Sequence, residues 1–584
     1  MNKRILPALI APEVSMYQAL QAISASPTRG GPSGIAVVVD MENKLLGILT
    51  DGDIRQLVLN KADLNQPVSK YMNSNPITVQ KGLKSLELVR TLLNSLRKRD
   101  NENARSRPSK LCDLPKFIIL DGDYIEDVVS PAELFQSHNI LQKNVCVLGM
   151  GYVGLTLSAV LADEGFYVMG IDTDPTVRSC LKDSTAHFFE NGLDPIIKKY
   201  NGTLFNVADK IEDQGHDIYI VAVGTPVDKN NIPQLDDIKE VLMQVAAVLK
   251  HDDLVVLRST VPPGSCRKIA IPILEEISEL KAGQDFHFVF APERTLEGKA
   301  LQELRSLPQV IGGITQECVS MASNFFSVFA PTIIRVDSLE AAELVKLINN
   351  TFRDVSFAYS NQIALLCHKL GVDTVTTINA ANKGYIRSSV PVPSPGVGGS
   401  CLKKDPFILL NTAKELGIDL NLIRKGRETN EFMTMHIAEM VFNFFIEHKI
   451  PLNAKIFLIG IAFKGEPETS DVRNSTSLDL IECLSSMKMS NVVVYDPVVT
   501  NETLEDVKLK PTTVQEGFRG AHATLIMNNH LSYLKFNIFE LLEFMEKPGL
   551  FFDGWHMFQQ NDIESASGIF YQGLGTKRYD SDID

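Results

Sequence analysis

The feature that most constrains the fold is a glycine-rich turn between an apolar strand and a helix. The strand VCVL leads into GMGYVG, which puts Gly149, Gly151 and Gly154 in the spacing of a dinucleotide-binding turn, with Tyr152 and Val153 inside it. The amides and the dipole at the N-terminus of the next helix suit a pyrophosphate. The segment therefore predicts a parallel α/β sheet that binds a dinucleotide.

The strand after this helix supports that interpretation. It has the sequence YVMGID and ends in Asp172, 23 residues after Gly149. A carboxylate there can accept hydrogen bonds from the ribose hydroxyls and repels a 2′-phosphate, which favours NAD over NADP. A tight turn in a fold that binds no ligand is the alternative, and the complete strand, turn and helix unit argues against it.

Alternation of strands and helices extends over most of the chain. One set of apolar strands is expected at residues 145–148, 168–171, 218–223, 254–257 and 287–290, and a second set at residues 455–463, 491–496 and 523–528. Such alternation is typical of parallel sheets covered by helices. We therefore expect a Rossmann-like domain over residues 143–335 and a smaller α/β domain over residues 450–575. A chain of 584 residues is too long for one core, which also indicates several domains.

A long helix is predicted between these two domains. No Pro or Gly interrupts the apolar pattern from Ser338 to Leu370, and Gly371 stands at the usual C-terminal position. Such a helix would span about 50 Å at about 1.5 Å per residue. A helix of this length normally joins domains or forms a subunit interface, and here it begins a helical middle domain over residues 336–445.

The first 140 residues predict two small α+β units separated by the polar segment Arg97–Lys110. In the first unit, strands over residues 34–40 and 45–50 precede a helix capped by Asp51. The second unit repeats this outline with a helix start at Ser130-Pro131. The expected fold class is α/β, with two Rossmann-like parallel-sheet domains joined by a long helix and a helical middle domain, plus this N-terminal pair. Residues 576–584 are expected to form an acidic tail.

Composition excludes several classes of function. The net charge of -14 argues against a nucleic-acid partner, because phosphate binding needs a basic face. The eight cysteines show no zinc-like spacing, so no metal site is expected, and a reducing compartment fits best. The apolar run near the N-terminus is interrupted by Pro7 and Pro12 and is too short for a signal peptide or a membrane span. We therefore expect a cytoplasmic protein without a membrane partner.

Three polar residues follow later strands of the first α/β domain. They are Thr225 in VGTPVD, Thr260 in LRSTVPPG and Glu293 in FAPERTLEG. Ligands bind outside the carboxyl ends of strands in open parallel sheets, so these side chains are expected to line the same crevice. A plain turn role without ligand contact is the alternative for each.

The clearest local motif for chemistry is PSPGVGGSCLKKDP, which begins at Pro393. Glycine-rich backbone ahead of Cys401 lets a ligand approach, and at a helix start the thiolate would be stabilised by the dipole and by Lys403 or Lys404. Asp405 lies four residues on, so in a helix it shares a face with Cys401 and could move protons beside it. On these residues alone, a buried cysteine that acts as a small hydrophobe is the commoner alternative.

Two further sets of polar residues stand beside predicted elements. Lys346 and Asn350 are four apart on the long helix, where an amine either extends to solvent or is held as a fixed charge. Phe463, Lys464 and Arg473 follow a strand end, which suits a nucleotide diphosphate, although a surface loop is the commoner reason for Lys and Arg.

Taken in order, these motifs resemble the family of UDP-glucose and GDP-mannose dehydrogenases, the nucleotide-sugar 6-dehydrogenases, over residues 143 to about 575. The family pattern includes GxGYVG, a TP turn, STVPPG, a helix with Lys and Asn four apart, and GGxCxxKD, all of which occur here. The resemblance implies NAD-dependent oxidation of a sugar CH2OH to a carboxylate, with Cys401 as the nucleophile. It also implies a homodimer or a higher homo-oligomer.

The resemblance further assigns roles to residues around the cysteine. Lys346 and Asn350 would stabilise oxyanions, Asp405 and Thr260 would handle water and protons, and Glu293 would assist thioester hydrolysis. The residues that it places at the nucleotide sugar are Arg294, Lys346, Arg387, Gly398, Phe463, Lys464 and Arg473.

Residues 1–140 resemble a CBS-domain pair, and GILTDGDIR is the diagnostic stretch. In that family Thr50 and Asp53 occupy the positions that bind the ribose of an adenine nucleotide. The second unit has no comparable TDGDIR, because Asp121-Gly122-Asp123 is followed by Tyr-Ile-Glu. We therefore do not expect both ligand sites to be intact.

The sugar stays open between two groups. APER and the segment after it are similar to enzymes acting on UDP-N-acetylhexosamines, namely UDP-N-acetylmannosamine or UDP-N-acetylglucosamine, which we favour. Against this, GGSC is commoner in UDP-glucose and GDP-mannose enzymes. A different class of function is a non-catalytic sensor of nucleotide sugars or adenine nucleotides. The presence of Cys401, Lys346, Asn350 and Asp405 together argues against a sensor.

Overall fold

The computed structural model describes residues 3–26, 32, 34–60, 62–80, 116–122, 124–129, 140–211 and 215–576. It divides into two units, Met1–Gln142 and Lys143–Asp584. The predicted exposed segment Arg97–Lys110, the predicted helix start at Ser130-Pro131, and residues 577–584 of the predicted acidic tail lie outside the described residues.

The N-terminal unit contains two three-stranded sheets with the same topology. Their strands are β1 (Leu9–Ile10), β2 (Ile35–Val39) and β3 (Leu45–Thr50), and β4 (Thr78–Gln80), β5 (Phe117–Asp121) and β6 (Tyr124–Val129). In each sheet the first two strands are parallel and the last two antiparallel, with an irregularity in the second pairing. Apolar side chains of both sheets, such as Val37 and Ile118, share one core. The predicted repeat of strand pairs is therefore confirmed.

Short helices complete this unit. They are η1 (Lys3–Ala8), α1 (Met16–Ala25), α2 (Asp51–Leu59), η3 (Val68–Lys70) and η5 (Ile140–Gln142). The predicted cap of α2 was wrong by one residue, because Thr50 and not Asp51 caps the helix. Thr50 Oγ1 donates to the Asp53 carboxylate over 2.7 Å, and the Asp53 amide donates back to Thr50 Oγ1 over 3.3 Å. Both residues of the expected adenine-nucleotide site thus form a capping box.

The second unit begins with an eight-stranded sheet. Its strands are β7 (Val145–Leu148), β8 (Val168–Ile171), β9 (Phe205–Ala208), β10 (Ile218–Val221), β11 (Leu254–Leu257), β12 (His287–Phe290), β13 (Gln309–Gly313) and β14 (Ile333–Arg335). The order is β14-β13-β12-β11-β10-β7-β8-β9, and only β12 and β13 are antiparallel. All five predicted strands are present, although the third ends two residues early. Strand order reverses direction at β7, and the carboxyl ends of strands at such a point are where open parallel sheets bind ligands.

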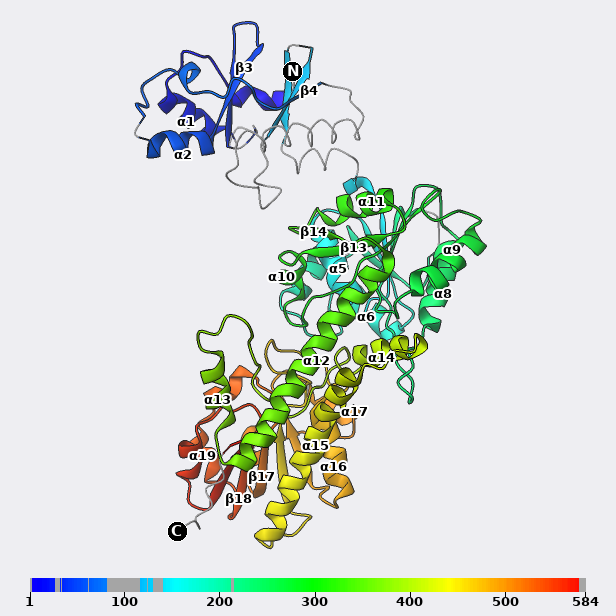
Figure 1. The fold of residues 1–584 in the computed structure, drawn as a ribbon, viewed down its shortest axis with the longest axis vertical. Coiled ribbons are helices and arrows are strands. Elements are labelled where there is room, and N and C mark those ends of the chain that lie inside the picture. Colours follow the sequence, from blue (N-terminus) through cyan, green and yellow to red (C-terminus); the bar gives the residue numbers. More distant parts are fainter. Residues whose placement is uncertain are drawn as a thin grey trace. The chain divides into compact units, whose positions relative to one another are not determined.

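Helices cover this sheet and continue into the middle of the chain (Figure 1). Those around the sheet are α5 (Tyr152–Asp163), α6 (Pro175–Lys182), α7 (Leu193–Tyr200), α8 (Asp236–Ala246), η6 (Cys266–Ala270), α9 (Ile271–Ser278), α10 (Ala300–Leu304) and α11 (Gln316–Phe326). The middle helices are α12 (Leu339–Leu370), α13 (Thr374–Asn382), α14 (Asp405–Glu415) and α15 (Asn421–Glu447). Ser338 caps α12, and Gly371 ends it with a φ of 67°. The predicted long helix is confirmed at both ends.

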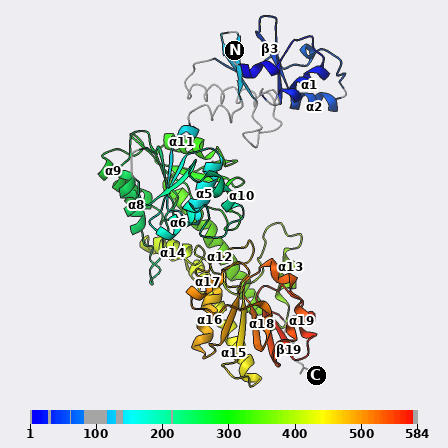
Figure 2. The same ribbon diagram turned by 180° about the vertical axis from the view of Figure 1, so that it is seen from behind.

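A five-stranded parallel sheet ends the chain. Its strands are β15 (Lys455–Ile459), β16 (Val492–Tyr495), β17 (Ala521–Ile526), β18 (Gly549–Asp553) and β19 (Ile569–Gly573), in the order β16-β15-β17-β18-β19. Its helices are α16 (Thr476–Ser486), α17 (Asn501–Asp506), α18 (Val514–Phe518), η7 (Leu531–Lys535), α19 (Ile538–Leu542) and α20 (Gln560–Glu564). α15 and α16 cover one face and α18, α19 and α20 the other (Figure 2).

Several expected boundaries differ from this second sheet. The strand expected over residues 523–528 lies at residues 521–526, and the one expected over residues 491–496 is one residue shorter at each end. The strand predicted over residues 455–463 ends at Ile459, because Gly460 has a φ of 92° and the next two amides bond to the Asp496 carboxylate. Thr576 is buried and accepts a hydrogen bond from the Gly573 amide, so it belongs to the domain and not to a tail. Among the described residues, no helix is long and apolar enough to cross a membrane.

The glycine-rich turn after β7 shows which of its glycines the fold requires. Gly149 has a φ of 95°, and a Cβ on Gly154 would lie 1.8 Å from the carbonyl oxygen of Gly149. A Cβ on Gly151 would have no other heavy atom within 4 Å. Gly151 precedes α5 as its N-cap, so the open space lies at the helix N-terminus. The fold does not need glycine there, whereas a ligand approaching the turn does.

We expect serine at these two positions to affect different properties, namely the stability of the fold at Gly154 and the affinity for NAD at Gly151. Gly154→Ser should lower the free energy of unfolding by about 1–3 kcal/mol through overpacking. Gly151→Ser should change the free energy of unfolding by about 0.5 kcal/mol or less, because serine is a good N-cap. The same substitution should weaken NAD binding at least about tenfold, which corresponds to about 1.4 kcal/mol. Denaturant unfolding and NAD titration measure both. Unchanged NAD affinity in a folded Gly151→Ser protein would contradict the assignment of this turn.

Candidate functional site

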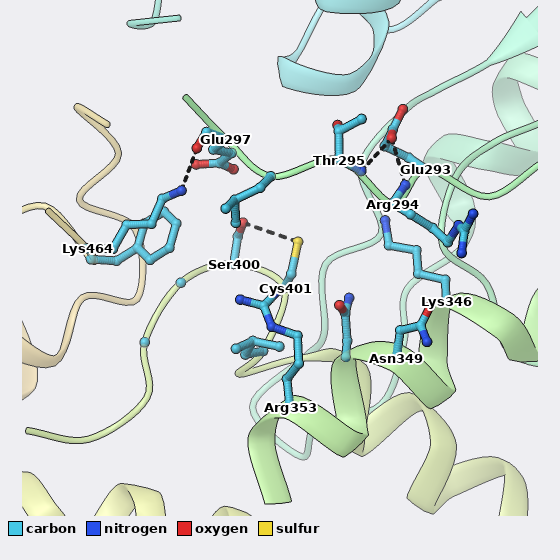
Figure 3. Close-up of a pocket in the computed structure, with 16 residues that line it drawn as sticks. Glu293, Arg294, Thr295, Glu297, Lys346, Asn349, Arg353, Ser400, Cys401 and Lys464 are labelled. Carbon is cyan, nitrogen blue, oxygen red and sulfur yellow. Dashed lines mark hydrogen bonds between the residues drawn. The ribbon is translucent and has the colours of Figure 1, made fainter. Parts of the chain in front are cut away.

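One pocket of the second unit is built from four separate segments (Figure 3). They are residues 293–297 after β12, one face of α12, residues 398–402 before α14, and residues 463–464 after β15. Each segment supplies at least one charged or nucleophilic side chain. The pocket thus collects polar groups from elements that are far apart in the chain.

Cys401 lies in the turn that leads into α14. The helix begins at Asp405, so the expectation that the cysteine sits at the helix start was wrong, although the Asp405 amide donates to the Cys401 carbonyl over 2.9 Å. The sulfur can be reached from the pocket and lies 4.0 Å from Ser400 Oγ. Surrounding protein atoms nevertheless raise the pKa of the Cys401 thiol, while Lys346 opposes that rise. The expected thiolate is therefore not the dominant form before a ligand binds.

The two lysines expected to stabilise the thiolate have other partners. Lys403 pairs with Asp479 at 2.5 Å, and Lys404 Nζ lies 3.2 Å from the Asp405 carboxylate. Lys404 still adds a smaller lowering effect on the Cys401 pKa. The larger positive influence on the sulfur comes from Lys346 of α12, which the motif alone did not connect to the cysteine.

The face of α12 that lines the pocket carries Lys346, Asn349, Asn350 and Arg353. Asn350 Nδ2 donates to the buried Asp405 carboxylate over 2.6 Å. Asn350 and Asp405, which lie on different helices, are therefore joined beside Cys401. The sequence analysis named Lys346 and Asn350 but missed Asn349 and Arg353. The helical spacing could have revealed Arg353, since it follows Asn350 by three residues and Lys346 by seven.

Glu293 is a buried carboxylate with both oxygens engaged. One oxygen accepts from the Arg294 and Thr295 amides over 2.6 Å and 2.7 Å, and the other pairs with the buried Arg258 guanidinium. Burial favours a higher pKa for Glu293, but Arg258, the Thr295 amide and Lys346 outweigh it and hold its pKa below the ordinary value. Glu293 is thus a firmly held anion in the pocket wall.

Glu297 and Lys464 influence each other's charge across the pocket, and the sequence analysis missed Glu297. Burial and Asp471 raise the pKa of Glu297 to about 7, although Lys464 opposes them. Burial lowers the pKa of Lys464 to about 8, although Glu297 opposes it. Lys464 Nζ also donates to the Glu297 carbonyl over 2.5 Å, which joins the two α/β domains across the pocket. The repeated Glu in PERTLE was the available signal.

Most of the residues expected at the nucleotide sugar lie in or beside the pocket, and one does not. Arg294, Gly398, Phe463 and Lys464 line the pocket together with Lys346. Arg473 lies beside it, close enough to Glu297 and Cys401 to interact with their charges, and its guanidinium pairs with Asp471 at 2.7 Å. Arg387 is different. It lies on an exposed segment with its guanidinium 6.0 Å from the Tyr385 ring and does not line this pocket.

The residues expected to hold the dinucleotide meet at the carboxyl ends of the first sheet. Asp172 accepts from the Met150 amide of the glycine-rich turn over 2.8 Å. Its carboxylate oxygens keep free lone pairs for ribose hydroxyls. Thr225 Oγ1 donates to the Thr260 carbonyl over 2.6 Å, so the two later strand ends are joined. The open space at Gly151, the helix N-terminus and Asp172 together fit NAD.

Tyr152 has a structural contact that its place in the motif did not predict. Its hydroxyl donates to Glu190 and accepts from the Gly298 amide over 3.0 Å. Glu190 also accepts from the Ala300 amide over 2.8 Å. The phenol and Glu190 thus tie the turn after β7 to residues 298–300, which directly follow the pocket-lining segment 293–297.

Comparison with protein families agrees with this geometry. Residues 143–330 match the NAD binding domain of the UDP-glucose/GDP-mannose dehydrogenase family, residues 340–432 its central domain, and residues 457–560 its UDP binding domain. Residues 1–60 match the CBS domain. The predicted family, the NAD cofactor and the presence of a CBS domain are therefore confirmed.

Individual proteins give the same result. The chain is 33% identical over 436 residues to the UDP-N-acetyl-D-mannosamine dehydrogenase of Pyrococcus horikoshii, which covers 74% of this chain and 99% of that protein. The solved structure of that enzyme has a TM-score of 0.66 at 32% identity, with the same coverage.

A second solved structure is that of an NDP-N-acetyl-D-galactosaminuronic acid dehydrogenase from Methanosarcina mazei Go1. It has a TM-score of 0.64 at 27% identity and covers 77% of this chain and 99% of its own. The matches span all three domains of the second unit. This chain therefore belongs to the UDP-glucose/GDP-mannose dehydrogenase family of NAD-dependent nucleotide-sugar dehydrogenases, with a CBS domain in its N-terminal unit.

Proposed function

We propose that this enzyme oxidises the C6 hydroxymethyl group of a UDP-N-acetylhexosamine to a carboxylate through a covalent intermediate on Cys401. The observation that carries the proposal is the meeting of Cys401, Lys346 and the Asn350–Asp405 pair in one pocket. NAD supplies the electron sink, because each molecule accepts one hydride and the four-electron oxidation needs two.

Cys401 provides the reason for a covalent route. Its sulfur adds to the carbonyl carbon of the aldehyde, and the resulting thiohemiacetal loses a hydride to become a thioester. Water then attacks the thioester carbon, the C–S bond breaks, the Cys401 thiol is regenerated, and the carboxylate product leaves the pocket. The raised pKa of Cys401 means that its proton must be removed when substrate is bound, and Lys346 favours that removal.

Lys346 and Asn350 are placed to stabilise negative charge on the substrate oxygen. Both line the pocket on one face of α12. Positioned donors of this kind typically contribute about 3–4 kcal/mol each when removed singly. Asn350 is oriented by its 2.6 Å bond to Asp405, which leaves its side-chain direction fixed before substrate arrives.

Proton transfer is shared in this proposal among several groups. The family resemblance assigns the positioning of water and the transfer of protons to Asp405 and Thr260. Asp405 is bonded to Asn350, which lines the pocket with Cys401, whereas Thr260 lies at the dinucleotide-binding strand ends and does not line the pocket. Glu293 contributes a fixed negative charge to hydrolysis, because its oxygens are already held by Arg258 and two amides. Glu297 has a pKa raised to about 7, which suits proton exchange at neutral pH, so we assign it part of the general-base work.

UDP-N-acetylmannosamine and UDP-N-acetylglucosamine are the proposed substrates. The relatives named UDP-N-acetyl-D-mannosamine dehydrogenase support this choice. Arg294, Arg353 and Lys464 give the pocket positive charge for an anionic sugar nucleotide despite the net charge of -14. UDP-glucose or GDP-mannose is the alternative substrate, which the GGSC sequence around Cys401 favours.

Subunit association and compartment also belong to the proposal. Ile348, Phe352, Tyr359 and Leu366 form an exposed apolar stripe along α12, which suits a homodimer or a higher homo-oligomer. The described cysteines are all free thiols, which supports a reducing cytoplasm.

The N-terminal unit is proposed to regulate the enzyme by binding an adenine nucleotide. Its matched CBS domain and the Thr50–Asp53 pair support this role. These residues already bond to each other as a helix cap, so a ribose would have to share them. A sensor without catalysis, the alternative of another class, would have no use for the groups around Cys401.

We expect two NADH for each uronate formed, because alcohol to acid is a four-electron oxidation. Limiting UDP-N-acetylmannosamine or UDP-N-acetylglucosamine with excess NAD, followed by NADH absorbance and product analysis, measures this ratio. UDP-glucose and GDP-mannose are the comparison substrates. A plateau at one NADH with free aldehyde as product would contradict the covalent route.

Cys401→Ala should abolish acid formation and leave NAD and nucleotide-sugar affinities close to wild type, because the sulfur is needed for the intermediate and not for docking. Cys483→Ala is the matched control, since this half-buried cysteine on α16 does not line the pocket. Single-turnover kinetics and binding titrations separate the two effects. Acid formation by Cys401→Ala at a near-normal rate means that the nucleophile is misassigned.

A protein comprising residues 143–584 should fold and turn over, because the N-terminal unit supplies none of the pocket residues. Titration of the full chain with AMP, ADP and ATP should change the apparent substrate affinity roughly 5- to 150-fold, and the truncated protein should not respond. NADH production and nucleotide binding are measured for both. Equal responses in both proteins, or a folded but inactive truncation, would refute the modular interpretation.

A further inference from the structure

A network of buried polar side chains lies where α12 and α15 pack against each other (Figure 1). The side chains of Arg427 and Asp354 are 1% and 0% exposed, and their Nη1 and Oδ1 atoms lie 2.6 Å apart. Asn430 Nδ2 donates to the same Asp354 oxygen over 2.9 Å, and Asn361 Nδ2 donates to Asn430 Oδ1 over 3.0 Å. The two helices are thus joined by charge and by hydrogen bonds.

The same network reaches the loop that carries Cys401. Arg427 Nη2 donates to the Val397 carbonyl over 3.0 Å, and Nη1 donates to the Leu402 carbonyl over 3.2 Å. These two carbonyls bracket Gly398, Gly399, Ser400 and Cys401. Upstream, the Ser394 amide donates to Asn361 Oδ1 over 2.9 Å. The loop is therefore attached to α12 and α15 at three points.

This loop requires external support. Gly396 and Gly399 have φ values of 92° and 90°, and glycine-rich backbone loses much conformational entropy when it is ordered. A planar guanidinium can donate to a carboxylate and to two carbonyls at once from separate nitrogens, whereas an ammonium carries its three N–H donors on a single nitrogen. The remaining Arg427 nitrogen, Nε, makes no hydrogen bond, and the Glu431 carboxylate lies 3.4 Å from it, so the hydrogen bonds of the group are those to Asp354 and to the two carbonyls.

Stability alone does not explain a buried ion pair here. Apolar residues of similar volume often stabilise a protein as well as a buried pair does, because burying charges is costly. An apolar side chain could not, however, donate to Val397 and Leu402. The position of the pair, directly behind the cysteine loop, therefore indicates a role in the geometry of the pocket.

We propose that Arg427 is a positioning residue that holds the Val397–Leu402 loop so that Cys401 faces Lys346 on α12. Figure 3 shows Cys401 and Lys346 entering the same pocket from the loop and from the helix. Asp354 follows Arg353 on α12, so the anchor of the guanidinium and the pocket-lining face belong to one helix. The inference rests on the proposed role of Cys401 as the nucleophile.

The principal test variant is Arg427→Lys, which keeps the charge opposite Asp354 but loses the planar fork. Arg424→Lys is the matched control, because Arg424 lies on the same helix with an exposed side chain that pairs with Asp419. The double variant Arg427→Met with Asp354→Asn removes both charges together. It keeps the test decisive if Arg427→Lys does not fold.

The readout that a purely structural role would not move is the coupling between Lys346 and the reactivity of Cys401. Alkylation by iodoacetamide at pH 8 is followed at the Cys401 peptide by mass spectrometry, with Cys180 and Cys483 as internal reference thiols. In the wild-type background, Lys346→Met should slow Cys401 alkylation about tenfold, equivalent to about one pKa unit of the thiol. In the Arg427→Lys background the same change should have less than about a twofold effect, because separated groups no longer couple.

Turnover gives the second measurement. Arg427→Lys should lower kcat about 100-fold, the usual scale for a misplacement of about 1 Å, while KM and NAD affinity stay close to wild type. Arg424→Lys should match wild type throughout. If the folded Arg427 variant retains either the Lys346 coupling or normal kcat, or if neither Arg427 variant folds, the proposal is overturned.

These experiments distinguish a failure of the proposed function from a failure of the positioning role of Arg427. A wild-type protein without turnover on any nucleotide sugar refutes the proposed function, and the alkylation coupling still decides whether Arg427 positions the loop. Normal turnover in Arg427→Lys refutes the positioning role and leaves the proposed function intact.

Discussion

One uninterrupted helix, α12, connects the two α/β domains that supply other segments of the pocket. At its start, Leu339 and Ala342 of α12 belong to the core of the first α/β domain, and further along Leu365 packs against the core of the second. An α-helix satisfies its backbone hydrogen bonds internally, so it can cross from one core to another without leaving buried amides unpaired. The face between these two anchors is the one that carries Lys346, Asn350 and Arg353 into the pocket.

Two glutamates of the pocket differ in pKa because their surroundings differ. Glu293 and Glu297 are four residues apart, yet one has a lowered pKa beside Arg258 and two amides, and the other has a pKa raised to about 7 by burial and Asp471. Pairs of like groups whose environments move their pKa values apart are typical of sites that need both a fixed anion and a proton acceptor. Positive side chains around them allow a protein of net charge -14 to receive an anionic nucleotide sugar.

Patterns of local sequence predicted much of the fold, and their failures have identifiable causes. The strands at residues 145–148, 168–171, 254–257 and 287–290 agree with the structure because continuous apolar runs are typical of buried parallel strands. The strand β13, with its two terminal glycines, and the exposed strand β14 carry no such signal and were not predicted. Cys401 was expected at a helix start, yet α14 begins at Asp405, because a chain pattern locates helix ends less well than helices themselves.

By itself the sequence determined the dinucleotide turn and the long helix and indicated the residues that we propose for the chemistry, because each depends on spacings of only a few residues. Only the tertiary structure decided which of these residues meet. Asn350 pairs with Asp405, protein atoms around Cys401 raise the pKa of its thiol, and Arg427 bonds to the loop that carries this cysteine; all of these contacts join segments that are dozens of residues apart. Local spacing cannot encode such distances, since they arise when two cores and one helix pack together in three dimensions.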